Sequence, residues 1–70
     1  MREWMRTARK EKQLTLKAVG EALGISESYC CAIENGERQK RMDLMIVSGL
    51  AEVFGMSVAE IIRLETENPQ

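Results

Sequence analysis

Few residues of this chain could do chemistry at a catalytic or metal site. The sequence has no histidine, so it lacks the commonest general base and the commonest transition-metal ligand of proteins. Its two cysteines, Cys30 and Cys31, are adjacent. A disulfide between neighbours is strained, and two thiols without histidine cannot complete a four-ligand zinc site. Phosphate-binding GxGxxG and GxxxxGK[ST] motifs are also missing. We therefore expect no enzyme, no cofactor and no metal.

The clearest chemical grouping is a set of three cations, Arg38, Lys40 and Arg41, in the polar segment 37–41. The net charge of the chain is −1, but it is unevenly divided. Residues 1–41 hold nine Lys/Arg and six Asp/Glu, giving +3, whereas residues 42–70 hold one and five, giving −4. A basic first part and an acidic second part would let one face of the molecule meet a polyanion.

The elements that must position these residues are predicted to be five short helices. Apolar residues recur at helical spacing, and glycines and cap residues separate the helical stretches. The expected ranges are about 2–12, 15–23, 27–35, 43–54 and 58–65, which together define an all-α fold. Seventy residues suffice for one domain, which we place at 1–65, followed by a flexible C-terminal tail at 66–70.

The expected core lies on one face of each helix. Trp4 is interpreted as a core anchor of the first helix, and Gly49 as the mark of a close helix crossing. The fourth helix should bury Ile46, Val47, Leu50, Ala51 and Phe54, and the last helix Val58, Ile61, Ile62 and Leu64. No apolar run is long enough for a membrane span and no secretory signal opens the chain, so a reducing cytoplasm is expected.

The second and third helices are joined by a very short connection. Thr15 is a good N-cap for the second helix, which Gly24 closes, and Ser26 is an N-cap for the third, which Gly36 closes. Two short helices separated by a three- or four-residue turn form a helix-turn-helix. We place the helix-turn-helix proper at about 15–35.

These residues resemble a known family. The stretch Leu14-Thr15, Val19-Gly20, Leu23-Gly24-Ile25-Ser26 and Ile33-Glu34-Asn35-Gly36 is similar to the helix-turn-helix of Cro/CI-type (Xre family) repressors. The segment 50–57 resembles the junction between the fourth and fifth helices of that family. The resemblance implies a compact five-helix, lambda-repressor-like domain whose third helix enters the major groove of double-stranded DNA. A glutamine common in the family near the start of the second helix is Leu16 here.

The resemblance also implies roles for individual residues. A structural salt bridge is expected between Arg9 and Glu34. The positions that usually face bases are Glu27, Ser28, Cys31 and Ala32. Those expected to meet phosphate are Lys17, Ser26, Tyr29, Arg38, Lys40 and Arg41.

Several of these residues have a second interpretation. Glu27 either reads a base or, as a first-turn carboxylate, stabilises its own helix. The cations of 37–41 either bind phosphates or form a solvated loop. Cys30 is expected to pack as a small hydrophobe, and an exposed Cys31 would allow oxidation to block DNA binding.

The sequence therefore predicts a sequence-specific, double-stranded DNA-binding transcriptional regulator, a repressor acting as a homodimer. The apolar edge expected to mediate the dimer comprises Phe54, Met56, Ile62 and Leu64. The alternative is a protein-interaction module of the same fold, such as an antitoxin-like or antirepressor partner. The negative net charge, the acidic second part of the chain and a third helix without lysine or arginine favour that alternative.

Overall fold

The helices follow the order expected from the sequence. The computed structural model describes residues 1–67, and regular structure within that range is entirely helical. The helices are α1 (Glu3–Glu11), α2 (Leu16–Leu23), α3 (Glu27–Glu34), α4 (Leu44–Phe54) and α5 (Val58–Glu67). The prediction of an all-α, five-helix fold is confirmed.

Polar caps explain where the four later helices begin. In each case a side-chain oxygen accepts a hydrogen bond from a backbone amide of the first turn, which contributes about 1 kcal/mol. The capping oxygens of Thr15, Ser26, Asp43 and Ser57 lie 2.8–3.0 Å from the amide nitrogens of Ala18, Tyr29, Ile46 and Glu60 respectively. Both predicted caps of the helix-turn-helix, Thr15 and Ser26, are therefore confirmed.

The turn between α2 and α3 depends on two glycines. Gly24 ends α2 with a φ of +74°, in the left-handed region that favours glycine. Gly20 lies inside α2, and a Cβ placed on it would be 3.0 Å from the carbonyl oxygen of Ile25. The missing side chain lets the backbone of the turn lie directly against α2.

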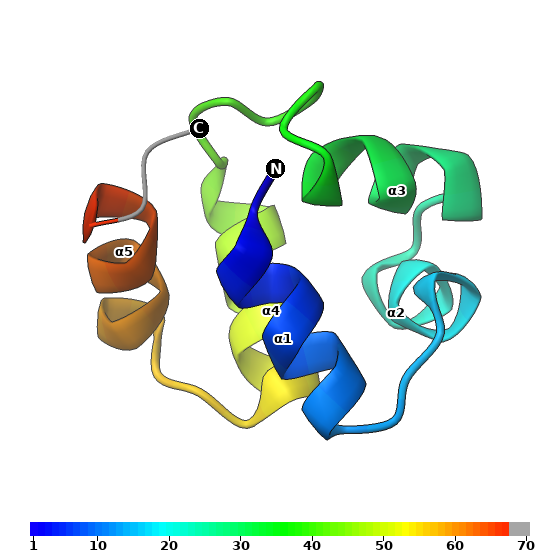
Figure 1. Ribbon diagram of the computed structural model, residues 1–70, viewed down its shortest axis with the longest axis horizontal. Coiled ribbons are helices and arrows are strands. Elements are labelled where there is room, and N and C mark those ends of the chain that lie inside the picture. The colour runs from blue at the N-terminus through cyan, green and yellow to red at the C-terminus, as the bar shows by residue number, and fades with distance from the viewer. Residues whose placement is uncertain (68–70) are drawn as a thin grey trace.

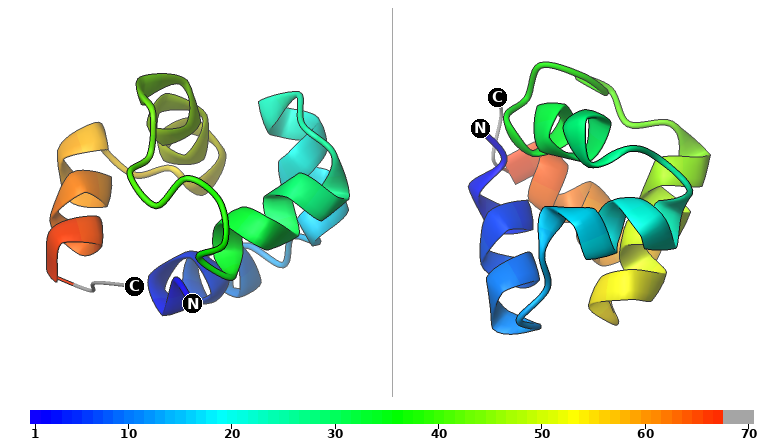
Figure 2. Two further views of the ribbon diagram at one scale, coloured as in Figure 1. Left: turned by 90° about the horizontal axis from the view of Figure 1, so that it is seen from above. Right: turned by 90° about the vertical axis from the view of Figure 1, so that its right-hand side faces the viewer.

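The helix α4 lies between α5 on one side and α2 and α3 on the other, and α1 faces it from the other side of the core (Figures 1 and 2). The ring of Trp4 meets that of Phe54 edge to face, with centroids 6.5 Å apart, so Trp4 is the predicted core anchor. A Cβ on Gly49 would lie 3.0 Å from Cγ of Leu23, which confirms a close crossing of α4 and α2. The predicted buried face of α4 is also confirmed, since Ile46, Val47, Leu50, Ala51 and Phe54 are all buried.

Two predictions about apolar residues are wrong. Val58 and Ile62 were expected in the core but are 41% and 52% exposed. Their helix, α5, buries only a narrow stripe centred on Ile61, because it packs at the edge of the molecule (Figure 1). Phe54 was predicted both on the buried face of α4 and on the apolar edge for dimerisation. It is 3% exposed and packs against Trp4, so its assignment to the edge is wrong.

The C-terminal helix is longer than predicted. α5 reaches Glu67 rather than ending at Glu65. Arg63 and Glu67 form an i,i+4 ion pair at 3.0 Å, and the hydroxyl of Thr66 donates to the carbonyl oxygen of Ile62. These local interactions stabilise the last turn. The rest of the predicted flexible tail, 68–70, lies outside the described residues.

The helices α4 and α5 are joined at Gly55, whose φ is +67°. Among the described residues no single helix combines the length and apolar composition needed to cross a bilayer, although α4 and α5, bent by 108°, would meet both criteria together.

Candidate nucleic-acid interface

One side of α3 faces outward while the other is buried. Cys30 and Ile33 are fully buried, and the carboxylate-bearing Glu34 is nearly so. Glu27 and Ser28 are exposed at the start of the helix. Cys31 and Ala32, also predicted to face bases, are half-buried on its later turns. The four side chains thus remain accessible on a helix at the periphery, on the opposite side of the molecule from α5 (Figure 1).

An ion pair between α1 and α3 fixes the orientation of α3. Arg9 and Glu34 form two hydrogen bonds, from Nε to Oε2 at 2.9 Å and from Nη2 to Oε1 at 3.2 Å. Arg9 also donates through Nη1 to the carbonyl oxygen of Leu14 at 3.0 Å. The hydrogen bond to Glu34 raises the pKa of the Arg9 guanidinium. This is the pair that the family resemblance implied, and it belongs to the scaffold of the site.

The segment 36–43, here called the basic loop, leaves the C-terminal end of α3 and runs to the start of α4 (Figures 1 and 2). Arg38, Lys40 and Arg41 are exposed on it. The side chain of Gln39 donates from Nε2 to the hydroxyl oxygen of Tyr29 in α3 at 2.9 Å. This hydrogen bond connects the loop to α3, while Lys40 and Arg41 also border the hollow between the loop and α5.

The remaining residues predicted to meet phosphate lie at the two helix starts. Lys17 is exposed in the first turn of α2, and Ser26 is exposed at the start of α3. The Ser26 hydroxyl accepts from the Tyr29 amide, and the Tyr29 hydroxyl accepts from Gln39, so each keeps its own proton to donate. Unpaired amides and a partial positive charge at a helix start also favour phosphate.

The charge of this region is close to balanced. Between Thr15 and Arg41 the exposed cations are Lys17, Arg38, Lys40 and Arg41, and the exposed carboxylates are Glu21, Glu27 and Glu37. The cations are concentrated in the basic loop, so the positive potential is local rather than spread over α3.

The two cysteines differ in their surroundings. Burial raises the pKa of the Cys30 thiol to about 11, so that it stays protonated at neutral pH and packs as a small apolar residue. Cys31 is half-buried, and its sulfur accepts a hydrogen bond from the Asn35 side chain at 3.6 Å. Within residues 1–67, no group of three His, Cys, Asp or Glu side chains could hold a metal ion.

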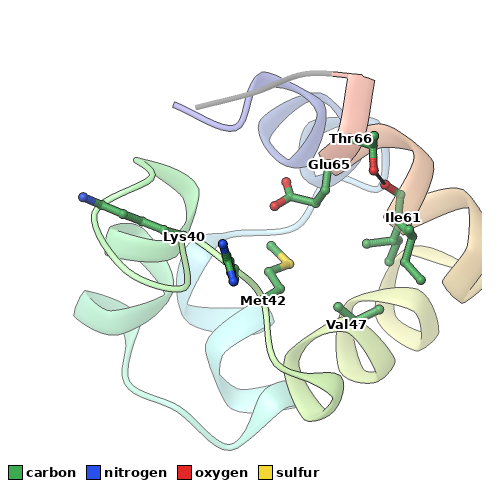
Figure 3. Close-up of a pocket in the computed structure, with 8 residues that line it drawn as sticks. Lys40, Met42, Val47, Ile61, Glu65 and Thr66 are labelled. Atoms are coloured by element: carbon green, nitrogen blue, oxygen red, sulfur yellow. Dashed lines mark hydrogen bonds between the residues drawn. The ribbon is translucent and has the colours of Figure 1, made fainter.

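A shallow hollow separates the basic loop from α5. Met42, Val47 and Ile61 form its apolar lining (Figure 3). The Lys40 side chain extends away from the hollow, whereas the Glu65 carboxylate points from α5 toward the loop (Figure 3). The Glu65 carboxylate points this way because it forms an ion pair with a residue to which the sequence analysis assigned no role.

That residue is Arg2, whose side chain is completely buried. Its Nε lies 2.9 Å from Oε2 of Glu65, and its Nη1 donates to carbonyl oxygens of α3 and of the basic loop. Arg2 directly precedes α1 and has a non-helical backbone, so the apolar pattern of the helix gave it no role. The helical spacing could not identify Glu65 as the partner.

The fold and the outward α3 define a helix-turn-helix domain. A family model described as helix-turn-helix, of the Xre/Cro/CI type, matches residues 5–61. The chain belongs to this family, which is a family of DNA-binding domains. Comparisons with curated proteins and with solved structures found no match.

Proposed function

We propose that this protein is a sequence-specific regulator of transcription, a repressor that binds double-stranded DNA as a homodimer. The observation that supports the proposal is the basic loop, which follows α3, bonds to it through Gln39 and Tyr29, and carries the exposed cations Arg38, Lys40 and Arg41. A helix in the major groove reads base edges, while cations beside it bind the phosphates and set its register.

In this proposal the residues divide into two groups. Arg38, Lys40 and Arg41 bind phosphate, assisted by Lys17 and by the hydroxyls of Ser26 and Tyr29. Glu27, Ser28, Cys31 and Ala32 face the bases. Glu27 is suited to accept a hydrogen bond from the N4 amino group of cytosine. Ile62, 52% exposed, with the half-buried Met56 and Leu64, is the proposed apolar contact between protomers.

The first test is an electrophoretic shift with DNA from around the protein's own gene, repeated over a series of salt concentrations. Each phosphate that the protein neutralises should add about 0.9 to the slope of log affinity against log salt. Replacing Arg38 and Arg41 with alanine should weaken binding to every sequence and flatten the slope. Replacing Ser28 with alanine should instead change the preference among sequences, because a base contact carries about 1–3 kcal/mol of discrimination.

The matched control is Arg63→Ala. It removes the same charge from α5, on the opposite side of the molecule from α3 (Figure 1). Affinity and salt slope should stay at the wild-type values in this variant. If Arg63→Ala weakened binding as much as Arg38→Ala, the effect would come from net charge, and the proposed contact surface would be wrong.

The second candidate function is a protein-interaction module of the same fold. The exposed carboxylates Glu21, Glu27 and Glu37 favour it, since they would lie close to phosphates in a DNA complex. A folded protein that retains no DNA at low salt, but elutes with one protein partner in fixed stoichiometry, would support this function instead.

A further inference from the structure

Arg2, near the N-terminus, is bonded directly to the end of α3. Its backbone amide donates to the carbonyl oxygen of Glu34 at 2.7 Å, and its Nη1 donates to that of Ile33 at 2.5 Å. Ile33 and Glu34 are the last two residues of α3, where carbonyls lack partners within the helix. Since α3 has no basic residue in its last turn, Arg2 supplies the cation that a helix C-terminus favours.

The same guanidinium also binds the basic loop. Nη1 donates to the carbonyl oxygen of Arg38 at 3.1 Å, and Nη2 donates to that of Gln39. One planar group thus bonds the end of α3 and the two loop residues that follow Glu37. A guanidinium can do this because its five N–H donors have a fixed, forked arrangement.

Gln39 is held from its other side as well. Its side chain donates to the Tyr29 hydroxyl and accepts from the Asp43 amide, each at 2.9 Å. Its φ is +57°, a value that residues other than glycine rarely adopt, so these contacts maintain an otherwise unfavourable backbone. The exposed Arg38 and Lys40 flank Gln39 and therefore project from a fixed segment.

The Nε side of the same guanidinium bonds to Glu65, which connects Arg2 to the core. The Glu65 carboxylate neutralises the buried guanidinium and accepts, through the same Oε2, a hydrogen bond from Nε1 of Trp4 at 2.7 Å. Trp4 in turn packs edge to face on Phe54 of α4. The loop backbone is thereby connected to the core through Arg2, although it lies at the surface.

We propose that Arg2 is a positioning residue for phosphate binding, which sets the backbone of the basic loop so that Arg38 and Lys40 lie in place before DNA arrives. The proposal rests on the proposed DNA-binding function. A group held in its bound geometry loses less conformational freedom on binding, so affinity rises without any contact between Arg2 and DNA.

The test compares Arg2→Lys with the wild type, using a fluorescent mixed-sequence duplex and a salt series at a temperature where circular dichroism shows both proteins folded. Lysine keeps the positive charge, but its single ammonium nitrogen has three N–H donors, too few for Glu65 and the three carbonyls together. We expect affinity to fall about tenfold at low salt and the slope to decrease by about 0.9 for each phosphate that is no longer neutralised. Arg6→Lys, which changes an exposed arginine in α1, is the matched control and should alter neither quantity.

A second measurement does not depend on DNA. Hydrogen exchange of the Asp43 amide, which bonds to the Gln39 side chain, should accelerate at least about tenfold in Arg2→Lys and stay unchanged in Arg6→Lys. If Arg2→Lys does not fold, Glu65→Gln serves in its place, because it keeps the side-chain shape while removing the charge that holds Arg2.

The outcomes separate the two proposals. A folded Arg2→Lys with wild-type affinity, slope and amide exchange would overturn the role of Arg2. A wild-type protein that shows no salt-dependent binding would overturn the DNA-binding function, whatever the exchange rate of Asp43. A lower melting temperature with an unchanged salt slope would assign Arg2 to stability alone and also overturn the proposal.

Discussion

At the scale of single residues, two arginines, the buried Arg2 and the partly buried Arg9, organise the molecule around α3. Arg9 pairs with Glu34, and Arg2 pairs with Glu65 while capping the end of the same helix. Both pairs satisfy their hydrogen-bonding groups, and no buried side-chain nitrogen or oxygen in residues 1–67 lacks a partner. Removing either partner of such a pair leaves a charge inside the molecule unpaired, which destabilises the fold.

The Arg9–Glu34 pair gives a quantitative prediction. Their side chains are 13% and 6% exposed, so Glu34→Gln should lower the free energy of unfolding by about 3 kcal/mol, since it leaves Arg9 buried without an opposite charge. The matched control is Glu67→Gln, which breaks the exposed Arg63–Glu67 pair and should cost no more than about 0.5 kcal/mol. Urea denaturation of the three proteins measures both values. If Glu34→Gln and Glu67→Gln lowered the free energy of unfolding equally, the burial of the Arg9–Glu34 pair would have no energetic consequence.

The two pairs also differ in how far the sequence could predict them. Arg9 and Glu34 stand at positions that the family resemblance connects. Arg2 and Glu65 are separated by almost the whole chain, and neither lies in a pattern that indicates its partner. Their contact follows from the packing of α5 beside the N-terminus, which is a property of the assembled core and not of any local segment.

At the scale of elements, caps and glycines determine the helix-turn-helix. Thr15, Ser26 and Gly24 were predictable because their roles depend on one or two turns of chain. The burial of α5 was not, because Val58 and Ile62 have the same apolar character as Ile61 and only the position of the neighbouring helices distinguishes them. The end of α5 was missed for a different reason, since its last three residues are polar and its last turn is stabilised by the Arg63–Glu67 pair and the hydrogen bond from Thr66 to Ile62.

Two helical glycines provide a matched pair for testing the turn. Alanine gains up to about 1 kcal/mol of helix propensity at either position. At Gly20 the added Cβ would meet the backbone oxygen of Ile25 at 3.0 Å, which cannot move without opening the turn. At Gly49 it would meet Cγ of the Leu23 side chain at 3.0 Å, and a side chain can adjust more easily than backbone.

We therefore expect Gly20→Ala to destabilise the protein by about 1–3 kcal/mol and to weaken DNA binding, because α3 would tilt away from α2. Gly49→Ala should remain within about 1 kcal/mol of the wild type and bind DNA normally. Thermal denaturation and a binding assay at low temperature measure both effects. If Gly20→Ala were as stable as Gly49→Ala, the turn would accommodate the added Cβ, and the expected clash with the Ile25 carbonyl would be wrong.

At the scale of the whole molecule, the charge asymmetry of the sequence is only partly expressed at the surface. Two of the nine cations in residues 1–41, Arg2 and Arg9, are used in buried ion pairs. The surface positive charge near α3 therefore comes mainly from the basic loop, which agrees with the grouping of cations noted in the sequence at 37–41. The exposed carboxylates beside it limit non-specific attraction, so binding should depend on the correct placement of a few cations.

The most direct test of DNA binding through α3 is a two-dimensional NMR titration of the ¹⁵N-labelled protein with a DNA duplex at low salt. We predict that the largest shift changes occur in the amides of Glu27–Ala32 and Arg38–Arg41, with little change on the exposed side of α5 around Arg63. Changes centred on α5, or a spectrum that stays the same at the lowest salt while the protein is folded, would contradict DNA binding through α3.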